Sequence, residues 1–173
     1  MGFMRQVWNT SALWPFYTED EAPTVSYITD KGMSFFRQPE RGLFMSISLK
    51  IRVVPGFYAV SRLDAAAAIP EWLQGPGFKA AVHSDDEVTV VCLEERVPRE
   101  TKTEKGWACL RTIGPFPFEA AGIVKSVIDP LSNNGIGVFV LCTYDGEHVL
   151  VPSSQIELAL LHLEAAGHVV STN

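Results

Sequence analysis

Apolar and polar residues alternate with turn residues at regular intervals from about position 45 to the end of the chain. Short apolar or alternating runs bounded by Gly, Pro, Asn and Asp predict β-strands. Longer runs with apolar residues three and four positions apart predict helices. The predicted strands cover 49–54, 57–63, 78–83, 87–93, 106–113, 136–142, 148–152 and 168–172, and the predicted helices cover 69–74, 118–135 and 153–167.

Turn and helix-breaking residues set the expected ends of these elements. Pro55 and Gly56 are predicted to close the first strand. Pro130 falls inside the helix 118–135 and should kink it or shorten its last turn, because proline lacks a backbone donor. Ser153 is the expected N-cap of the last helix, and Gly167 its stop.

The patterned part of the chain contains an internal repeat. Sliding the sequence against itself by sixty positions, without a gap, aligns turn residues and hairpin acids. The matches are Pro55 with Pro115, Pro70 with Pro130, Gly75 with Gly135, Gly77 with Gly137, Asp85 with Asp145, Glu87 with Glu147, and Val91 with Val151. We therefore predict two copies of one supersecondary unit.

The repeat divides the chain into an irregular N-terminal arm, 1–44, a first unit, 45–108, and a second unit, 109–173. Each unit is expected to be α+β, with the order βαββαβ and helices on one face of an antiparallel sheet. The second unit has both long helical patterns, whereas the first is degenerate. Because the clean pattern begins at Met45, the sequence leaves open whether translation starts there or at Met1.

Composition is that of a globular protein, with 47% hydrophobic and 20% charged residues. Fourteen basic and twenty acidic residues give a net charge of −6, with Lys and Arg scattered along the chain, which argues against nucleic acid and anionic lipid as partners. No apolar run is long enough to span a membrane. Cys92, Cys109 and Cys142 lie in apolar runs without metal-binding spacing, so buried free thiols in the cytoplasm are expected.

Catalytic signals are weak. The four histidines show no metal-ligand spacing, and His148 is expected to be exposed. The Gly-rich stretches lack nucleotide-loop patterns, so neither a metal nor another cofactor is predicted. A small enzyme using Glu119 or Glu147 as general base, with Cys142 nearby, is a weak alternative because no nucleophile-base pair is visible.

The most unusual stretch is CTYDGEHVLV, 142–151, which places an aromatic and two acids at a predicted hairpin tip. Its equivalent in the first copy, HSDDEVTVVC, also carries acids but has Ser84 in place of Tyr144. The acids therefore belong to the repeated hairpin, and the aromatic distinguishes the second copy. This difference favours a binding site on the second unit.

At this level of detail the chain resembles a known family. VVPGFYAVSRL, the helix motif AAGIV, the DPL-to-Gly helix end and the CTYD hairpin are similar to the tandem ACT-domain proteins, relatives of CASTOR-type arginine sensors and of the ACT modules of aspartate kinases. The likeness covers about 45–170. It implies two ferredoxin-like ACT units that bind an amino acid without catalysis, in a protein that forms a homodimer and acts on a regulatory protein partner.

The resemblance also implies a set of ligand-binding residues, since the family holds its ligand between a helix-opening loop and a strand of a neighbouring unit. Carried over by position, these are Phe118, Glu119, Gly122, Ile123, Gly137, Val138, Thr143, Tyr144 and Glu147.

These residue types suit a free amino acid, basic or small. Unpaired N-H groups at the helix start would bind its carboxylate, while Glu119, Glu147 and Tyr144 would attract its ammonium group. Each position also has a structural reading: Gly122 can serve helix packing, Tyr144 the core, and Glu147 a solvated tip. The alternative function is an ACT-fold interaction or dimerisation module that has lost its ligand.

Overall fold

The structure is a computed structural model that describes residues 26–28, 34–36 and 47–172. Within the arm, β1 (Ser26–Ile28) pairs with β2 (Ser34–Phe36) in a separate antiparallel sheet. The rest of the predicted arm 1–44 lies outside the described residues, so its predicted irregularity is not tested there.

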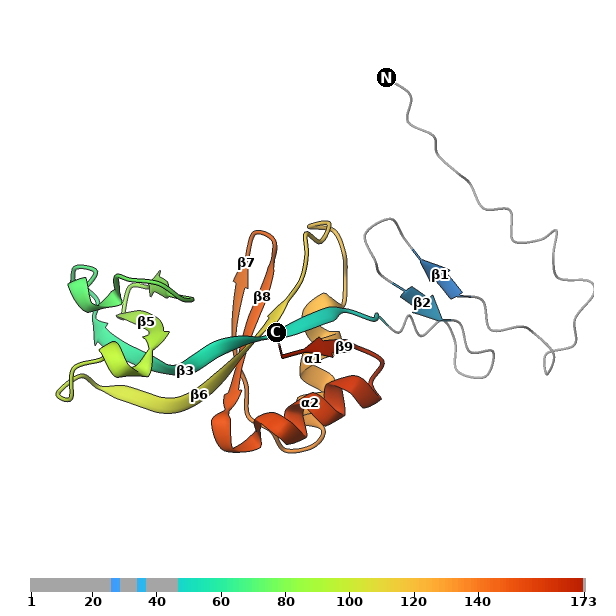
Figure 1. Cartoon of the computed structure of the whole chain (residues 1–173). Coiled ribbons are helices and arrows are strands. Elements are labelled where there is room, and N and C mark those ends of the chain that lie inside the picture. The colour runs from blue at the N-terminus through green and yellow to red at the C-terminus, as the bar shows by residue number, and fades with distance from the viewer. Residues whose placement is uncertain (1–25, 29–33, 37–46, 173) are drawn as a thin grey trace, which may run out of the picture.

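The main body is one seven-stranded sheet (Figure 1). Its strands are β3 (Lys50–Asp64), β4 (Ala80–His83), β5 (Glu87–Leu93), β6 (Thr103–Thr112), β7 (Phe139–Thr143), β8 (Gly146–Pro152) and β9 (Val169–Ser171). The strand order is β4-β5-β3-β6-β8-β7, with β9 paired to β3. All neighbours are antiparallel except β9, which runs parallel to β3. This confirms an α+β fold with an antiparallel sheet.

Strand β3 joins two segments that the sequence predicted as separate strands. Its first part pairs with β9 and its second part with β5, while β6 lies along both. The Pro55-Gly56 pair does not end the strand: the β3–β6 register shifts between Val54 and Phe57, and Gly56 has a φ of 95°. Such a bulge bends a strand and leaves it continuous, so the predicted break was wrong.

The helices are confined to the second half of the chain, α1 (Ile123–Ser132) and α2 (Ile156–Ala165), and among the described residues no α-helix precedes Ile123. The predicted helix 69–74 is a short 3-10 turn, η3 (Glu71–Leu73), so that prediction was wrong. Two further 3-10 turns, η4 (Glu94–Arg96) and η5 (Ser153–Gln155), follow the two hairpins. In α1, Pro130 lies two residues before the helix end, which agrees with the predicted shortening.

Apolar side chains cover both faces of the sheet. One face packs against α1 and α2 through a cluster that includes Leu110, Val127, Leu131, Val149 and Leu163. The other, helix-free face carries Val54, Tyr58, Cys109 and Leu150, with Phe78, Trp107, Phe139 and Leu141 packed beside them. A third cluster, which includes Leu73, Val88 and Val90, supports the β5 end.

The cysteines only partly follow the prediction. Cys92 and Cys109 are free and buried, and burial raises the pKa of Cys109 to about 12, which keeps it a thiol. Cys142 is free but exposed, because it lies in β7 beside the hairpin tip, so its predicted burial was wrong.

Candidate functional site

The loop after β6 packs closely against the turn between β7 and β8. A Cβ atom placed on Gly114 would lie 1.8 Å from the carbonyl oxygen of Asp145, and one on Gly146 would lie 2.8 Å from the carbonyl oxygen of Thr112. Both contacts are far shorter than real Cβ contacts, so only glycine fits at these two positions. The backbone of the loop that leads to α1 and the tip of the second hairpin are therefore held together.

Two aromatic rings extend from this junction. Phe118, in the loop before α1, and Tyr144, at the hairpin tip, lie edge to face with their ring centroids 5.0 Å apart. Each side chain is 79% exposed. The core reading of Tyr144 is therefore wrong, since the ring contacts another exposed ring outside the apolar clusters.

Glu147 faces inward at the base of the same hairpin and is 8% exposed. The Thr112 hydroxyl donates a hydrogen bond to the Glu147 carboxylate, and the Glu147 backbone N-H donates to the Thr112 hydroxyl oxygen at 2.8 Å. Thr143 donates its hydroxyl to the carbonyl oxygen of Gly146 at 2.7 Å, which closes the turn. The Glu147 carboxylate is therefore already hydrogen-bonded within the base of the hairpin.

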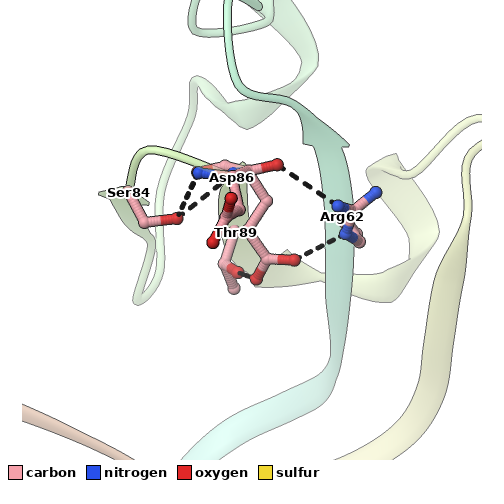
Figure 2. A network of polar contacts seen from close by, with 5 residues as sticks. Arg62, Ser84, Asp86 and Thr89 are labelled. Carbon is pink, nitrogen blue, oxygen red and sulfur yellow. Dashed lines mark hydrogen bonds and ion pairs between the residues drawn. The ribbon is translucent and has the colours of Figure 1, made fainter.

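Glu87, the equivalent acid of the first hairpin, also forms side-chain hydrogen bonds, but at a partly exposed position (Figure 2). Arg62 of β3 donates from Nε to the Glu87 carboxylate at 2.5 Å, and Thr89 donates its hydroxyl to the same carboxylate at 2.8 Å. These bonds lower the pKa of Glu87, the Thr89 bond contributing most. In both hairpins the repeated acid fastens the tip to the adjacent strand, but only Glu147 is buried.

Helix α1 begins at an exposed glycine. Gly122 is the N-cap, with a φ of 90° in the left-handed region, and it provides no side-chain bond to the first turn. A side chain there would be strained and would approach Ile47 to 3.3 Å. Ile123, the first helical residue, is buried in the helix-side cluster. The first backbone N-H groups of α1 are thus without a side-chain partner among the described residues.

The remaining predicted residues lie around these groups without direct bonds to them. Glu119 is exposed in the same loop as Phe118. Gly137, before β7, is exposed, and a Cβ atom there would meet nothing within 4 Å. Val138 packs against the helix-side cluster that also contains Ile123. The structure thus brings Phe118 and Tyr144 into contact, and the ligand-binding roles of all nine residues stay predictions.

His148 was expected to be exposed, but it is 7% exposed on the helix-free face. Its ring stacks on Phe78 with centroids 3.8 Å apart, and its Nδ1 has no hydrogen-bond partner among the described residues. Burial, together with the positive charges of Arg111 and Arg52, lowers the pKa of His148 to about 4. The alternation of β8, in which Val149 and Val151 face the helices, could have placed it on this face.

His168 is a second buried histidine, which the sequence did not single out. Its Nδ1 accepts the Leu49 N-H at 3.2 Å, and its Nε2 lies 2.9 Å from the Ser126 carbonyl oxygen. Because Nδ1 accepts, the proton of the neutral ring is on Nε2 and is donated to Ser126. Burial lowers the pKa of this ring, against the effect of the Ser126 bond. His168 thereby joins the start of β3, α1 and the approach to β9.

Other site types find no support in the part of the chain that is described. There, no three His, Cys, Asp or Glu side chains are grouped closely enough to hold a metal ion. Among the same residues, no helix is long and apolar enough to cross a membrane.

Comparison with known protein families identifies the second half of the chain. A family model described as an ACT domain matches residues 102–165, which span β6 to α2. A second model, described as an N-terminal domain, matches residues 56–100. A search of curated proteins gave no match.

Solved structures extend the likeness to most of the chain. A crystal structure of a protein from Agobacterium tumefaciens is 44% identical, with a TM-score of 0.69, and the match covers 73% of this chain and 94% of that one. A Vibrio cholerae protein of unknown function, described as a possible transport protein, has 18% identity and a TM-score of 0.56, with 69% and 90% of the chains covered. The aspartate kinase of Clostridium acetobutylicum, described as an allosteric enzyme, has 15% identity and a TM-score of 0.52, with 65% of this chain and 33% of the kinase covered. The last two likenesses show a shared fold.

Proposed function

The chain belongs to the family of the Agobacterium tumefaciens protein and contains an ACT domain, and from this we propose that it is a noncatalytic regulatory protein that binds a free amino acid. The likeness to the regulatory fold of an aspartate kinase supports a regulatory role. The resemblance to CASTOR-type sensors makes arginine the first ligand to test. A location in the cytoplasm belongs to the same proposal.

The observation that carries the proposal is the contact between Phe118 and Tyr144. Both rings are 79% exposed, so their apolar surface gains little from folding. The junction below them is nevertheless rigid, because Gly114 and Gly146 allow backbone-to-backbone packing. Exposed aromatic rings on a rigid support are suited to cover an ammonium or guanidinium group, a contact worth about 0.5–2 kcal/mol.

The start of α1 supplies the complementary group. Gly122 leaves the first-turn N-H groups without a side-chain cap and keeps a Cβ atom away from them. These N-H groups, together with the helix dipole, favour a carboxylate. Glu119 is exposed nearby in sequence and can pair with the ammonium group of the ligand. Glu147 acts in this proposal mainly by holding the hairpin tip through Thr112.

We propose that the ligand lies between ACT units, with Gly137 and Val138 provided by a neighbouring unit of a homodimer. The strand order supports two units inside the single sheet. The second part of β3, with β4, β5 and the start of β6, gives the order β4-β5-β3-β6, the ferredoxin-like arrangement. The end of β6, with β8 and β7, repeats the order β3-β5-β4.

A protein-interaction module without a ligand is the second candidate. The exposed pair of Phe118 and Tyr144 also favours this function, because aromatic residues are enriched in interface centres. In that case both rings would be covered by another protein and no amino acid would bind.

Thermal-shift measurements against each of the twenty amino acids separate the two candidates. A ligand at a hundredfold excess over its dissociation constant should stabilise the protein by about 2.7 kcal/mol. Tyr144→Ala should lower the affinity about tenfold, since a cation-aromatic contact is lost. Phe57→Ala, at a ring 57% exposed on β3, is the matched control and should leave the affinity unchanged. If no amino acid raises the unfolding temperature, the amino-acid-binding proposal is wrong and the protein-interaction module remains.

A further inference from the structure

The helix-free face of the sheet carries a row of basic side chains. Arg52 of β3 lies directly opposite Arg111 of β6, and Arg111 lies opposite His148 of β8. Beyond these three residues, Arg52 is paired with Ser171 of β9, and His148 is paired with Leu141 of β7. No acid therefore lies in this row. We name Arg52, Arg111 and His148 the arginine row. It corrects the expectation that basic residues are scattered, because strand pairing joins residues far apart in the sequence.

The arginine row lies on the opposite face of the sheet from the helices. Ile51 and Leu110, the strand neighbours of the two arginines, belong to the helix-side cluster. Successive side chains of a strand point to opposite faces, so Arg52 and Arg111 point away from α1 and α2. Lys50 is exposed and lies two residues before Arg52, so its side chain extends the basic row at the sheet end.

The two arginines have no acidic partner in the described part of the chain. The ion pairs found there are Arg62 with Glu87 and Lys125 with Asp129. Glu147 precedes His148 in β8, but its carboxylate is bonded to Thr112. Like charges directly opposite each other destabilise an antiparallel pair. Two half-buried arginines directly opposite each other therefore cost folding free energy that no described side chain offsets.

Buried polar atoms at the same place also lack partners. Nε of Arg111 and Nδ1 of His148 are buried without a hydrogen bond among the described residues. Burying a polar group without a hydrogen-bond partner is unfavourable, so such groups mark a place where a partner is missing. Burial lowers the pKa of His148, and the positive charges of Arg111 and Arg52 lower it in the same direction.

The strand register gives the arginine row an approximate two-fold symmetry. Ile51 pairs with Thr112, Arg52 with Arg111 and Val53 with Leu110, so the centre of this pairing lies between the two arginines. The sequences around them, IRVVPGF (51–57) and LRTIGPF (110–116), are alike. The two arginines of these similar stretches thus lie directly opposite each other. A ligand with two anionic oxygens can bond to one guanidinium on each side.

We propose that Arg52 and Arg111 form an anion-binding site on the helix-free face that takes a small molecule with two anionic oxygens, a phosphate group or a dicarboxylate. Each planar guanidinium presents paired donors that match carboxylate and phosphate oxygens. Apolar neighbours, Phe78 and Leu141, would limit water around the anion and strengthen these bonds. The site is separate from the amino-acid site proposed at α1, which lies on the other face.

Isothermal titration calorimetry of the full chain tests the proposal, with inorganic phosphate in one arm and succinate in the other. We expect binding in at least one arm, and the arm that binds identifies the chemistry of the ligand. Arg52→Gln and Arg111→Gln should each lower the affinity about tenfold or more, because a charge-assisted hydrogen bond is lost. Arg99→Gln removes the same charge from an exposed loop position and should change the affinity less than about twofold.

A second measurement locates the anion without a substitution. Phosphate or succinate bound at the arginine row should raise the titration midpoint of the His148 imidazole in NMR spectra, since an anion offsets the nearby positive charges. The ring resonances of exposed His83 should not change when the anion is added at constant pH. The proposal is overturned if neither anion binds, if Arg99→Gln weakens binding as much as Arg52→Gln, or if the His148 midpoint does not move.

Discussion

Thr112 and Glu147 form two hydrogen bonds with each other across β6 and β8, one through the carboxylate and one through the backbone N-H of Glu147. Thr112 is 1% exposed and Glu147 8% exposed, so water cannot readily replace either bond. The acid that the sequence suggested as a ligand contact is therefore already in use inside the fold. Its carboxylate supports the hairpin tip that carries Tyr144.

Replacing Thr112 with Val should destabilise the protein by about 1–3 kcal/mol, because the Glu147 carboxylate and N-H lose their buried partner. Urea unfolding measures the change. Thr89→Val is the matched control, since it removes a hydroxyl-carboxylate bond at the exposed first hairpin (Figure 2) and should cost less than about 1 kcal/mol. Equal losses of unfolding free energy in the two variants would show that the buried Thr112 bonds stabilise the protein no more than the Thr89 bond.

Gly114→Ala and Gly146→Ala should each destabilise the protein by at least about 2 kcal/mol, since the added methyl group would overlap backbone atoms of Asp145 or Thr112. Gly137→Ala is the control, because its Cβ atom would lie in open space and its φ is not in the left-handed region. That variant should be neutral or up to about 1 kcal/mol more stable. Thermal unfolding of the three variants compares them directly; a neutral Gly114→Ala would contradict the close packing of loop and turn.

Acid should weaken the fold through His148. Its pKa is about 4 in the folded protein and 6.5 ordinarily, so between these values the unfolded chain binds more protons. Stability is therefore unaffected by this group above about pH 6.5 and falls as the pH drops toward 4, by a total on the order of 3 kcal/mol.

Unfolding free energies of the protein and of His148→Phe, measured from pH 7 to 4 in buffer without phosphate or dicarboxylate, isolate this contribution. The variant keeps a ring against Phe78 and should lose the pH dependence assigned to His148. His83→Phe, at an exposed histidine, should retain it. Parallel curves for the protein and His148→Phe would exclude His148 as the cause.

In the absence of an anion, Arg52→Gln should leave the protein as stable or make it more stable, by up to about 1 kcal/mol, because repulsion between paired arginines is removed. Arg62→Gln is the matched control and should give no gain, since Arg62 is paired with Glu87. Chemical denaturation of both variants provides the comparison. A marked loss of stability in Arg52→Gln would indicate that Arg52 has a structural partner.

Local patterns predicted the strands and helix positions of the second half well, and the strand 87–93 agrees with β5 at both ends. The helix expected at 69–74 does not form, because only four residues lie between Pro70 and Gly75. So short a segment cannot offset the unfavourable free energy of helix nucleation, and a 3-10 turn forms instead. The break expected at Pro55 and Gly56 became a bulge, because the long partner β6 continues alongside.

The candidate site was less predictable, because it depends on contacts between distant segments. The exposure of Tyr144 and the burial of Glu147 follow from the closeness of Gly114 to Asp145, which no local pattern encodes. The arginine row arises in the same way, from the register of β3 against β6. The likeness of IRVVPGF to LRTIGPF was a signal that could have revealed it.

Strand β6 crosses the boundary between the two predicted sequence repeats, and this decides how the molecule can be divided. The boundary predicted between positions 108 and 109 falls inside β6 (Thr103–Thr112), so a cut there would split a strand in the middle of the sheet. A fragment holding the second predicted repeat alone would also lack β3, the strand that pairs with β9 and lies beside it in Figure 1. The two predicted units share the strands of one sheet, so the described sheet should unfold in a single cooperative transition.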